Sequence, residues 1–268
     1  MWLESEILQH LDEFIEIYKR RPIKNNKGGM QFSHMFYFYY VLKKIKPDLV
    51  IESGVYKGQS TWLIEITLPK TELLSLDINL GQRQYFSKKA KYSSIDFKFQ
   101  NIQNITDNSL VLFDDHVNHL ERLLEADVYG FKHIIFEDNY SGLHGDFQTI
   151  KQIQNNIIFN HKPGLFSLIK TNLNFLKVTL KKIFNPRYNT KRDLDLITKR
   201  IRDGMDEYMW LKIKNKINYY YEFPPLQKNK NLYNQTSDKE NLLTDNRDLN
   251  KVKLFDDSFN FFTYVNLK

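Results

Sequence analysis

Two glycines four residues apart follow an apolar run that ends in a carboxylate, in the stretch "VIESGVYKGQS" at residues 50–60. Glycine lets the backbone approach a ligand closely, and the free N–H groups at the start of a helix favour an anionic group. The spacing is G-x-x-x-G, whereas dinucleotide-binding turns carry G-x-G-x-x-G, so NAD is disfavoured. The stretch therefore predicts a ligand-binding turn between a strand and a helix, with Glu52, Gly54 and Gly58 at its centre.

Acidic side chains end three further apolar runs of the chain. Asp77 follows "ELLSL", Asp114 and Asp115 follow "SLVLF", and Asp138 follows "HIIFE". Carboxylate oxygens are the ligands that hard divalent cations prefer. Cysteine is absent, which excludes disulfides, thiolate nucleophiles and cysteine-ligated metal sites. The chemistry of this chain therefore falls to oxygen and imidazole groups.

The elements that must position these residues alternate along the chain. We expect strands at residues 48–53, 72–79, 95–100, 109–116 and 131–139. We expect helices at residues 31–47, 58–68, 81–92 and 117–130. The aromatic residues of 31–47 would also suit a strand, and Gly130 closes the last helix. The alternation predicts an α/β fold, a three-layer, doubly wound and mostly parallel sheet that binds ligands beyond the carboxyl ends of its strands.

The two ends of the chain and its charge set further expectations. Residues 1–22 predict an amphipathic helix of a cytoplasmic protein, because no basic region precedes an apolar one. No run approaches the roughly 18 apolar residues of a membrane span. The net charge of +7 is concentrated in residues 162–216, where fourteen basic residues face five acids. This segment suits a phosphorylated substrate or a nucleic acid.

The stretch "VIESGVYKGQSTWLIE" resembles the first motif of class I S-adenosylmethionine (SAM)-dependent methyltransferases, in particular the small-molecule O-methyltransferases of the catechol O-methyltransferase type. That group carries an E-x-G-x-Y-x-G-x-S pattern, which Glu52, Gly54, Tyr56, Gly58 and Ser60 match. The resemblance implies a Rossmann-like methyltransferase fold and a cofactor-binding role for these residues.

Two later stretches are similar to the same family in the same order. "LFDDH" is similar to the end of the family's fourth strand, where an Asp-His pair supplies a metal ligand and a cofactor contact, here Asp115 and His116. "IIFEDN" is similar to the end of the fifth strand, where Asp-Asn completes the metal site, here Asp138 and Asn139. Asp77 falls where the family's acid binds the ribose of SAM. The resemblance therefore implies SAM and Mg²⁺ or a similar divalent cation, and macrocin-type sugar O-methyltransferases share this layout.

The chain departs from the family at one position. Catechol-type members place a lysine three residues after the metal-binding Asp as the base, and this chain has Asn118 there. An amide cannot act as a general base. His144, in a glycine-flanked loop, is the candidate base, and His116 is the second candidate. The alternatives are deprotonation by the metal alone or loss of activity.

The sequence therefore predicts four regions. Residues 1–47 form N-terminal helices with an entrance loop, which His34 lines; 48–158 form the SAM-binding Rossmann-like core; 159–218 form a basic helical insertion or lid; 219–268 form terminal strands that complete the sheet. The leading hypothesis is an O-methyltransferase for a small hydroxylated acceptor, such as a sugar or nucleotide-linked sugar. The alternatives are an RNA-binding protein or RNA methyltransferase that uses the basic insertion, and a non-catalytic binding module. A homodimer is a further expectation.

Overall fold

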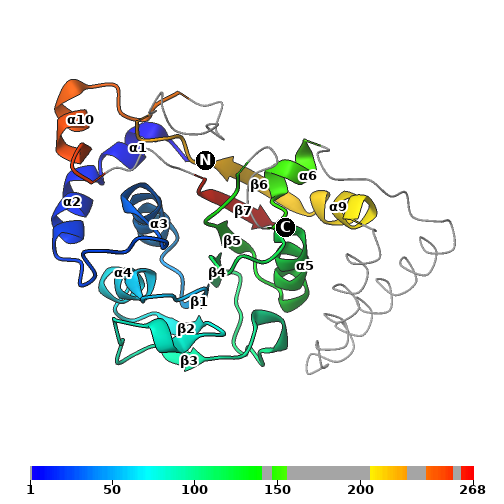
Figure 1. Ribbon diagram of the computed structural model, residues 1–268. Helices are drawn as coiled ribbons and strands as arrows, with labels where there is room; N and C mark the ends of the chain where they lie inside the picture. Colours follow the sequence, from blue (N-terminus) through cyan, green and yellow to red (C-terminus); the bar gives the residue numbers. More distant parts are fainter. Residues whose placement is uncertain (1, 141–146, 156–205, 228–239, 256–260) are drawn as a thin grey trace, which may run out of the picture.

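A single mostly parallel sheet organises the computed structural model, which describes residues 2–140, 147–155, 206–227, 240–255 and 261–268 (Figure 1). The described strands lie in the order β3-β2-β1-β4-β5-β7-β6. They are β1 (Leu49–Ser53), β2 (Glu72–Leu76), β3 (Lys91–Ser93), β4 (Leu110–Phe113), β5 (His133–Phe136), β6 (Ile217–Glu222) and β7 (Thr263–Leu267). The first five are parallel, and β7 is antiparallel to both β5 and β6. The expected doubly wound α/β sheet is confirmed.

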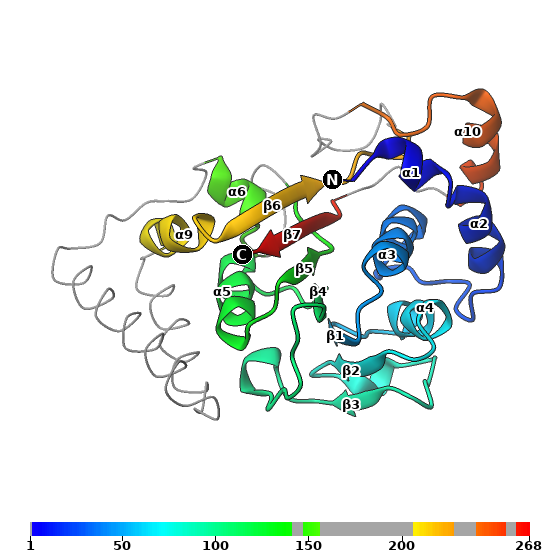
Figure 2. The same cartoon turned by 180° about the vertical axis from the view of Figure 1, so that it is seen from behind.

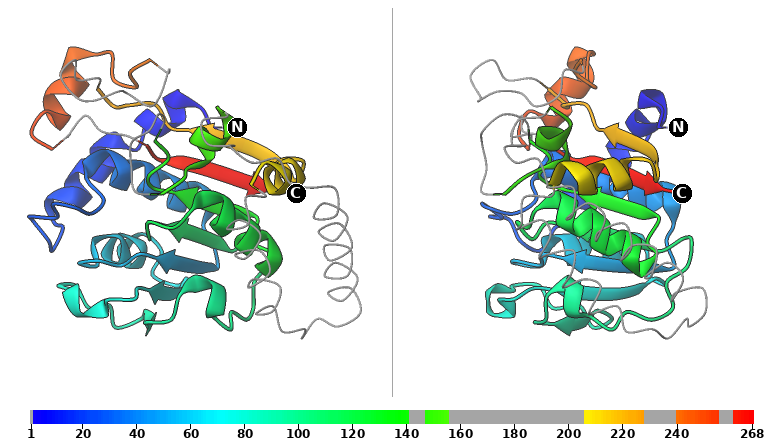
Figure 3. Two further views of the ribbon diagram at one scale, coloured as in Figure 1. Left: turned by 45° about the vertical axis from the view of Figure 1, so that its right-hand side comes forward. Right: turned by 90° about the vertical axis from the view of Figure 1, so that its right-hand side faces the viewer.

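Helices cover both faces of this sheet, as Figures 1 and 2 show from opposite sides. One face carries α3 (Phe32–Ile45) and α4 (Gln59–Thr67), with α1 (Glu4–Leu8), α2 (Leu11–Lys19) and α10 (Asn246–Val252) beyond them. The other face carries α5 (His119–Tyr129), α6 (Ile150–Gln154) and α9 (Asp206–Lys214). Figure 3 shows the sheet from β3 at one edge to the β6–β7 pair at the other.

Alternation along the strands divides the core between these two faces. In β4, Leu110 and Leu112 pack with α3 and α4, while Val111 and Phe113 pack with α5. Successive side chains of a strand point to opposite faces, so a strand with helices on both sides must be apolar throughout. This accounts for the continuous apolar runs in the sequence.

Helix α3 is buried from Phe32 to Leu42. A helix that is apolar on all sides needs neighbours on all sides, and α3 lies between the sheet and α2. The structure therefore confirms the helix expected at residues 31–47 and explains its aromatic content without a strand.

Three expectations about local structure were wrong. The helix expected at residues 81–92 is a short 3-10 turn, η1 (Leu80–Gln82), followed by irregular chain. There, Ser87 Oγ accepts from the N–H groups of Lys89 and Ala90, and such local side-chain bonds compete with a helix. The third strand is β3, not residues 95–100, which hold the 3-10 turn η2 (Phe97–Phe99). The first helix is interrupted between α1 and α2.

Most of the predicted basic insertion lies outside the described residues, which include only its last part, from residue 206 onward. Among the described helices, none combines the length and the apolar character that crossing a membrane requires.

Candidate functional site

A cleft of about 270 Å³ opens at the carboxyl ends of β1, β2 and β4. Its walls include Gly54, Asp77, Asp96, Asp114, His116 and Arg122. Parallel strands present their carboxyl ends at the same edge, and ligands of doubly wound sheets bind there. The sequence placed its candidate residues at this edge for the same reason.

Gly54 is the point at which two strand ends meet. Its φ of +101° lies in the region that glycine adopts without strain, and a Cβ on this residue would lie 1.9 Å from the carbonyl oxygen of Asp114. Its N–H donates to Leu76 O at 2.8 Å, and the N–H of Asp114 donates to Ser53 O at 2.8 Å. The requirement for glycine therefore comes from the close approach of β4, as well as from the turn.

Asp77, at the end of β2, holds the turn that follows Gly54. Its Oδ2 accepts from the N–H groups of Val55 at 3.0 Å and Tyr56 at 2.8 Å, and its Oδ1 accepts from Asn79 N at 2.7 Å. The carboxylate also lines the cleft. A carboxylate has about four acceptor positions, so Asp77 can shape this turn and still accept from a ligand.

Glu52 lies beneath the cleft and is fully buried. Its Oε2 accepts from the hydroxyls of Thr61 at 2.7 Å and Ser75 at 2.6 Å, which ties β1 to α4 and β2. Burial raises the pKa of this carboxyl, and hydrogen bonding from Ser60 opposes that rise. Glu52 and Ser60 are not among the residues that line the described cleft, so the geometry assigns them the positioning of α4.

Gly58 and Tyr56 contact parts of the chain that the sequence did not connect. Gly58 begins α4 with a φ of +91°, and a Cβ there would meet Tyr85 O at 2.9 Å. Tyr56 has a φ of +47° and donates its hydroxyl to Lys27 O at 3.1 Å. Gly28 and Gly29 line the cleft beside it. The expected entrance loop thus forms one wall of the cleft.

Four acids follow β4 and β5, and two of them have a cationic or histidine partner. Asp115 pairs with Arg122 at 2.9 Å and accepts from Ser53 Oγ at 2.5 Å. Glu137 contacts the ring of buried His34, whose Nε2 accepts from Phe261 N at 3.0 Å. His34 is therefore a buried support of this strand end, not a residue of the entrance.

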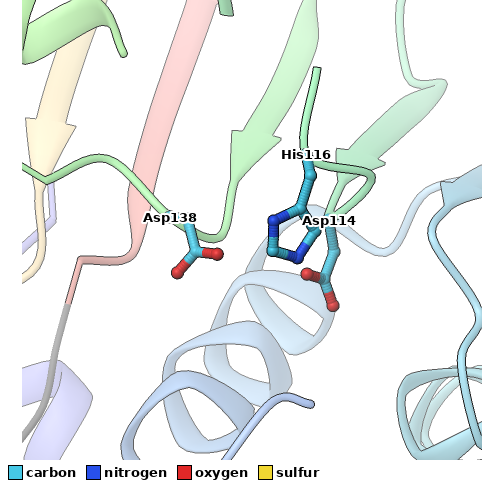
Figure 4. Close-up of side chains that lie close together, drawn as sticks. All are labelled: Asp114, His116 and Asp138. Atoms are coloured by element: carbon cyan, nitrogen blue, oxygen red, sulfur yellow. The ribbon is translucent and has the colours of Figure 1, made fainter. Parts of the chain in front are cut away.

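The other two acids, Asp114 and Asp138, gather with His116 (Figure 4). One potential ligand atom from each of the three side chains lies within 4.8 Å of the others. Burial raises the pKa of Asp114 well above its ordinary value, and the nearby charges of Glu137 and Asp138 raise it further. A bound cation would reverse this effect, because it favours the charged carboxylates. The three side chains therefore suit a divalent cation.

Arg122 is a functional candidate that the sequence reasoning missed. It is 1% exposed, and its guanidinium contacts Asp96 at 2.7 Å and Glu125 at 2.7 Å, besides Asp115. Three acids around a buried cation fix the floor of the cleft between β4 and the chain after β3. The available signal was weak, because Arg122 is one of several charged residues in the helical stretch "HLERLLEAD".

Asn139, expected as a metal ligand, is turned toward β6 and β7. Its Nδ2 donates to Tyr220 Oη at 2.7 Å and Thr263 Oγ1 at 3.0 Å, and its Oδ1 accepts from Lys151 N at 3.0 Å. Its polar atoms are thus engaged away from Asp114. The geometry offers Asp114 and His116 to a cation in the places where the sequence offered Asp115 and Asn139.

Asn118, at the position of the family lysine, caps α5. Its Oδ1 accepts from the N–H groups of Leu120 at 2.8 Å and Glu121 at 3.3 Å, as a helix N-cap does. The position therefore serves the helix and does not line the cleft. His144, the candidate base, lies outside the described residues.

Comparison with known proteins gives a likeness of fold. No family model matches the chain. The uncharacterized protein MJ0627 of Methanocaldococcus jannaschii is 26% identical over 102 residues, 37% of this chain and 87% of that protein. The SAH-bound methyltransferase PaMTH1 of Podospora anserina has a TM-score of 0.41 at 11% identity, covering 98% of this chain and 88% of that chain.

Two further solved structures are similar. The plantazolicin methyltransferase BpumL, in complex with a pentazolic desmethylPZN analog and SAH, has a TM-score of 0.41 at 11% identity and covers 99% of this chain and 96% of its own. CmcI-N160 with SAH has a TM-score of 0.37 at 14% identity, covering 44% of this chain and 68% of that chain. At these values the role of the cleft must be argued from its own geometry.

Proposed function

We propose that this chain is a SAM-dependent O-methyltransferase that acts on a small hydroxylated acceptor with the help of a divalent cation. The observation that carries the proposal is one cleft with two different halves. The half after β1 and β2 carries the Gly54 turn and Asp77, and the half after β4 carries Asp114 and His116, with Asp138 within reach. This juxtaposition suits a cofactor and an acceptor held side by side.

The residues of the first half fit SAM. Asp77 offers acceptor positions to the ribose hydroxyls. Ile78 and Ile95 also line the cleft and are 82% and 53% exposed, so they offer apolar surface to the adenine ring. SAM supplies the methyl group from its sulfonium, an electrophile that needs no residue of this chain to activate it.

The residues of the second half fit the needs of the acceptor. In the transfer, the bond from sulfur to the methyl carbon breaks and a bond from the acceptor oxygen to that carbon forms, while the hydroxyl proton leaves. The chain must align the two groups and help remove that proton. A divalent cation held by Asp114 and Asp138 would stabilise the alkoxide. His144 remains a predicted base, and a cation reduces the need for one.

The finer identity of the acceptor remains a prediction. A sugar or nucleotide-linked sugar rests on the resemblance to macrocin-type enzymes. A phosphorylated acceptor or RNA would be matched to the basic segment at residues 162–216. That segment lies mostly outside the described residues, so no contact described above favours RNA over a small molecule.

Calorimetric titration of SAM tests the cofactor half. We expect wild-type protein to bind SAM, and Asp77→Asn to weaken that binding by about tenfold or more, because one acceptor oxygen becomes a donor. Asp48→Asn is the matched control, since this carboxylate accepts from Thr106 Oγ1 at the opposite end of β1. Absence of SAM binding by the wild-type protein would refute the proposal.

Transfer is tested separately from binding. Purified protein is incubated with radiolabelled SAM and a panel of catechols, sugars and nucleotide sugars, with and without a chelator. A labelled product that the chelator suppresses would support a cation-assisted O-methyltransferase. SAM binding without transfer to any acceptor, in the presence of divalent cations, would favour the non-catalytic binding module.

A further inference from the structure

The acids that follow β4 and β5 fall into two classes. Asp115 and Glu137 are partnered inside the protein, by Arg122 and His34. Asp114 and Asp138 make no ion pair with a lysine or arginine among the described residues, although a carboxylate oxygen of each lies within 4.8 Å of the other. The fold therefore gives one pair of carboxylates a partner within the protein and leaves the second pair close together beside the cleft, which Asp114 lines.

The third member of the group is a histidine, which lines the cleft with Asp114. His116 has a φ of +56°, in the left-handed region, which brings its ring over the strand end between the two carboxylates (Figure 4). The ring is exposed, while Asp114 and Asp138 are half-buried. An ion from solution could therefore reach the group without any movement of the core.

We infer that Asp114, Asp138 and His116 bind a divalent cation through two carboxylates and one imidazole nitrogen, and that the site selects a first-row transition metal ion over Mg²⁺. Mg²⁺ is held mainly by oxygen ligands and water, whereas an imidazole ligand favours transition metal ions. The inference deepens the proposed function by giving the class of ion that would activate the acceptor. It assigns His116 to the ion, where the sequence resemblance had assigned it to the cofactor and the chemistry of imidazole had made it the second candidate base.

The choice of variants follows from the backbone at residue 116. Asparagine tolerates the left-handed region better than most residues, so His116→Asn retains the turn and removes the imidazole. His116→Asp gives the site an all-oxygen set of side-chain ligands. His10→Ala removes a histidine at the start of α2, outside the cleft, and serves as the control.

The first experiment titrates Co²⁺ and Mg²⁺ separately into chelator-treated protein by calorimetry. We expect wild-type protein and His10→Ala to prefer Co²⁺. In His116→Asn the ratio of Co²⁺ to Mg²⁺ affinity should fall by about tenfold or more, and in His116→Asp the preference should move further toward Mg²⁺. An unchanged ratio in His116→Asn, with wild-type circular dichroism, would overturn the inference.

A second measurement compares wild-type protein with His116→Asn by spectroscopy. Pulsed electron paramagnetic resonance of the Mn²⁺-loaded protein should show coupling to a directly bound nitrogen, and His116→Asn should lose it. Coupling that is absent from the wild type, or that persists in the variant, would overturn the inference. Neither measurement uses SAM, so a chain that binds Co²⁺ through His116 but never binds SAM would refute the proposed methyl transfer and leave the metal site standing.

Discussion

The two halves of the cleft are built alike, from loops that follow parallel strands, yet they treat their acidic side chains differently. After β1 and β2, the carboxylates of Glu52 and Asp77 accept hydrogen bonds from neighbouring hydroxyls and backbone N–H groups. After β4 and β5, Asp115 is neutralised by Arg122, while Asp114 and Asp138 are not paired with a lysine or arginine among the described residues. The carboxylates of the first half hold the local structure through hydrogen bonds. The second half contains two carboxylates that are not paired with a lysine or arginine among the described residues.

This difference suggests how each half meets its ligand. A half whose acids already hold the turn is preorganised, so it can bind a cofactor with little rearrangement. A half with uncompensated acids gains stability when a cation arrives, because close like charges oppose ionisation until then. Five substitutions test this difference, and they are described below in order of decreasing effect.

Gly54→Ala should have the largest effect, because Gly54 lies where the two halves of the cleft contact each other. The new Cβ would overlap the carbonyl of Asp114, and the left-handed φ would add strain. We expect a loss of more than about 4 kcal/mol in the free energy of unfolding, measured with urea. Gly130→Ala is the control: its φ is +98°, but a Cβ meets no atom within 4 Å, so it should cost about 1–2 kcal/mol. Equal losses would argue against the contact.

Arg122→Met should damage the second half alone. It leaves the carboxylates of Asp96 and Asp115 without their buried cation, and breaking a buried ion pair from one side costs about 3–5 kcal/mol. Urea unfolding measures the loss. Lys132→Met removes a cation from a solvent-exposed pair with Asp107 and should cost less than about 1 kcal/mol. Similar losses in the two variants would show that the network is weak.

His119 should make the second half sensitive to acid. Burial lowers the pKa of this imidazole from 6.5 to about 3, so the unfolded chain takes up a proton at pH values where the folded chain does not. Stability from this source is present above pH 6.5 and is lost as the pH falls toward 3. The wild-type protein should lose about 2 kcal/mol of its free energy of unfolding through this group between pH 7 and pH 5. His119→Phe keeps an aromatic ring against Phe136 and should not show that loss.

Glu125 provides a comparison of opposite sign for that measurement. Burial raises the pKa of its carboxyl to about 8, although Arg122 opposes the rise. Its contribution to stability is therefore present below about pH 4.5 and is lost as the pH rises through 8. We measure the midpoint of thermal unfolding as a function of pH. Its dependence on pH should become weaker on the alkaline side in Glu125→Gln and on the acid side in His119→Phe. The same profile in both variants would contradict these assignments.

Asn118→Lys should have the smallest effect. It places the family's lysine in this chain but removes the cap of α5, at a cost of about 1 kcal/mol, with no gain in methyl transfer because the position does not line the cleft. Thermal unfolding and the transfer assay measure the two effects. Asn118→Asp keeps a capping oxygen and should stay within about 0.5 kcal/mol of the wild type. Faster transfer in the lysine variant would reopen this position as the base.

Much of the fold could be predicted, because the apolar runs and the glycines at Gly54 and Gly130 report local requirements. The strand β3 could not, since a three-residue strand is shorter than the pattern that identifies one and competing bonds from Ser87 are invisible in sequence. The position of the candidate site could be predicted, but the roles of its individual residues could not. Adjacent acids such as Asp114 and Asp115 point in different directions, and only the position of Arg122 shows which of them is neutralised.

The contact between Gly54 and Asp114 also bears on how the cleft forms. The N–H of Gly54 donates to Leu76 of β2 and the N–H of Asp114 donates to Ser53 of β1, so the end of β1 is complete only when both neighbouring strands are in place. These residues are distant in sequence, and such contacts form only after the intervening chain has closed. The two halves should therefore emerge in one cooperative step of folding. A chain with a formed Gly54 turn and an unformed turn at Asp114 would be a rare species, and the amides of both residues should exchange with solvent at matching rates.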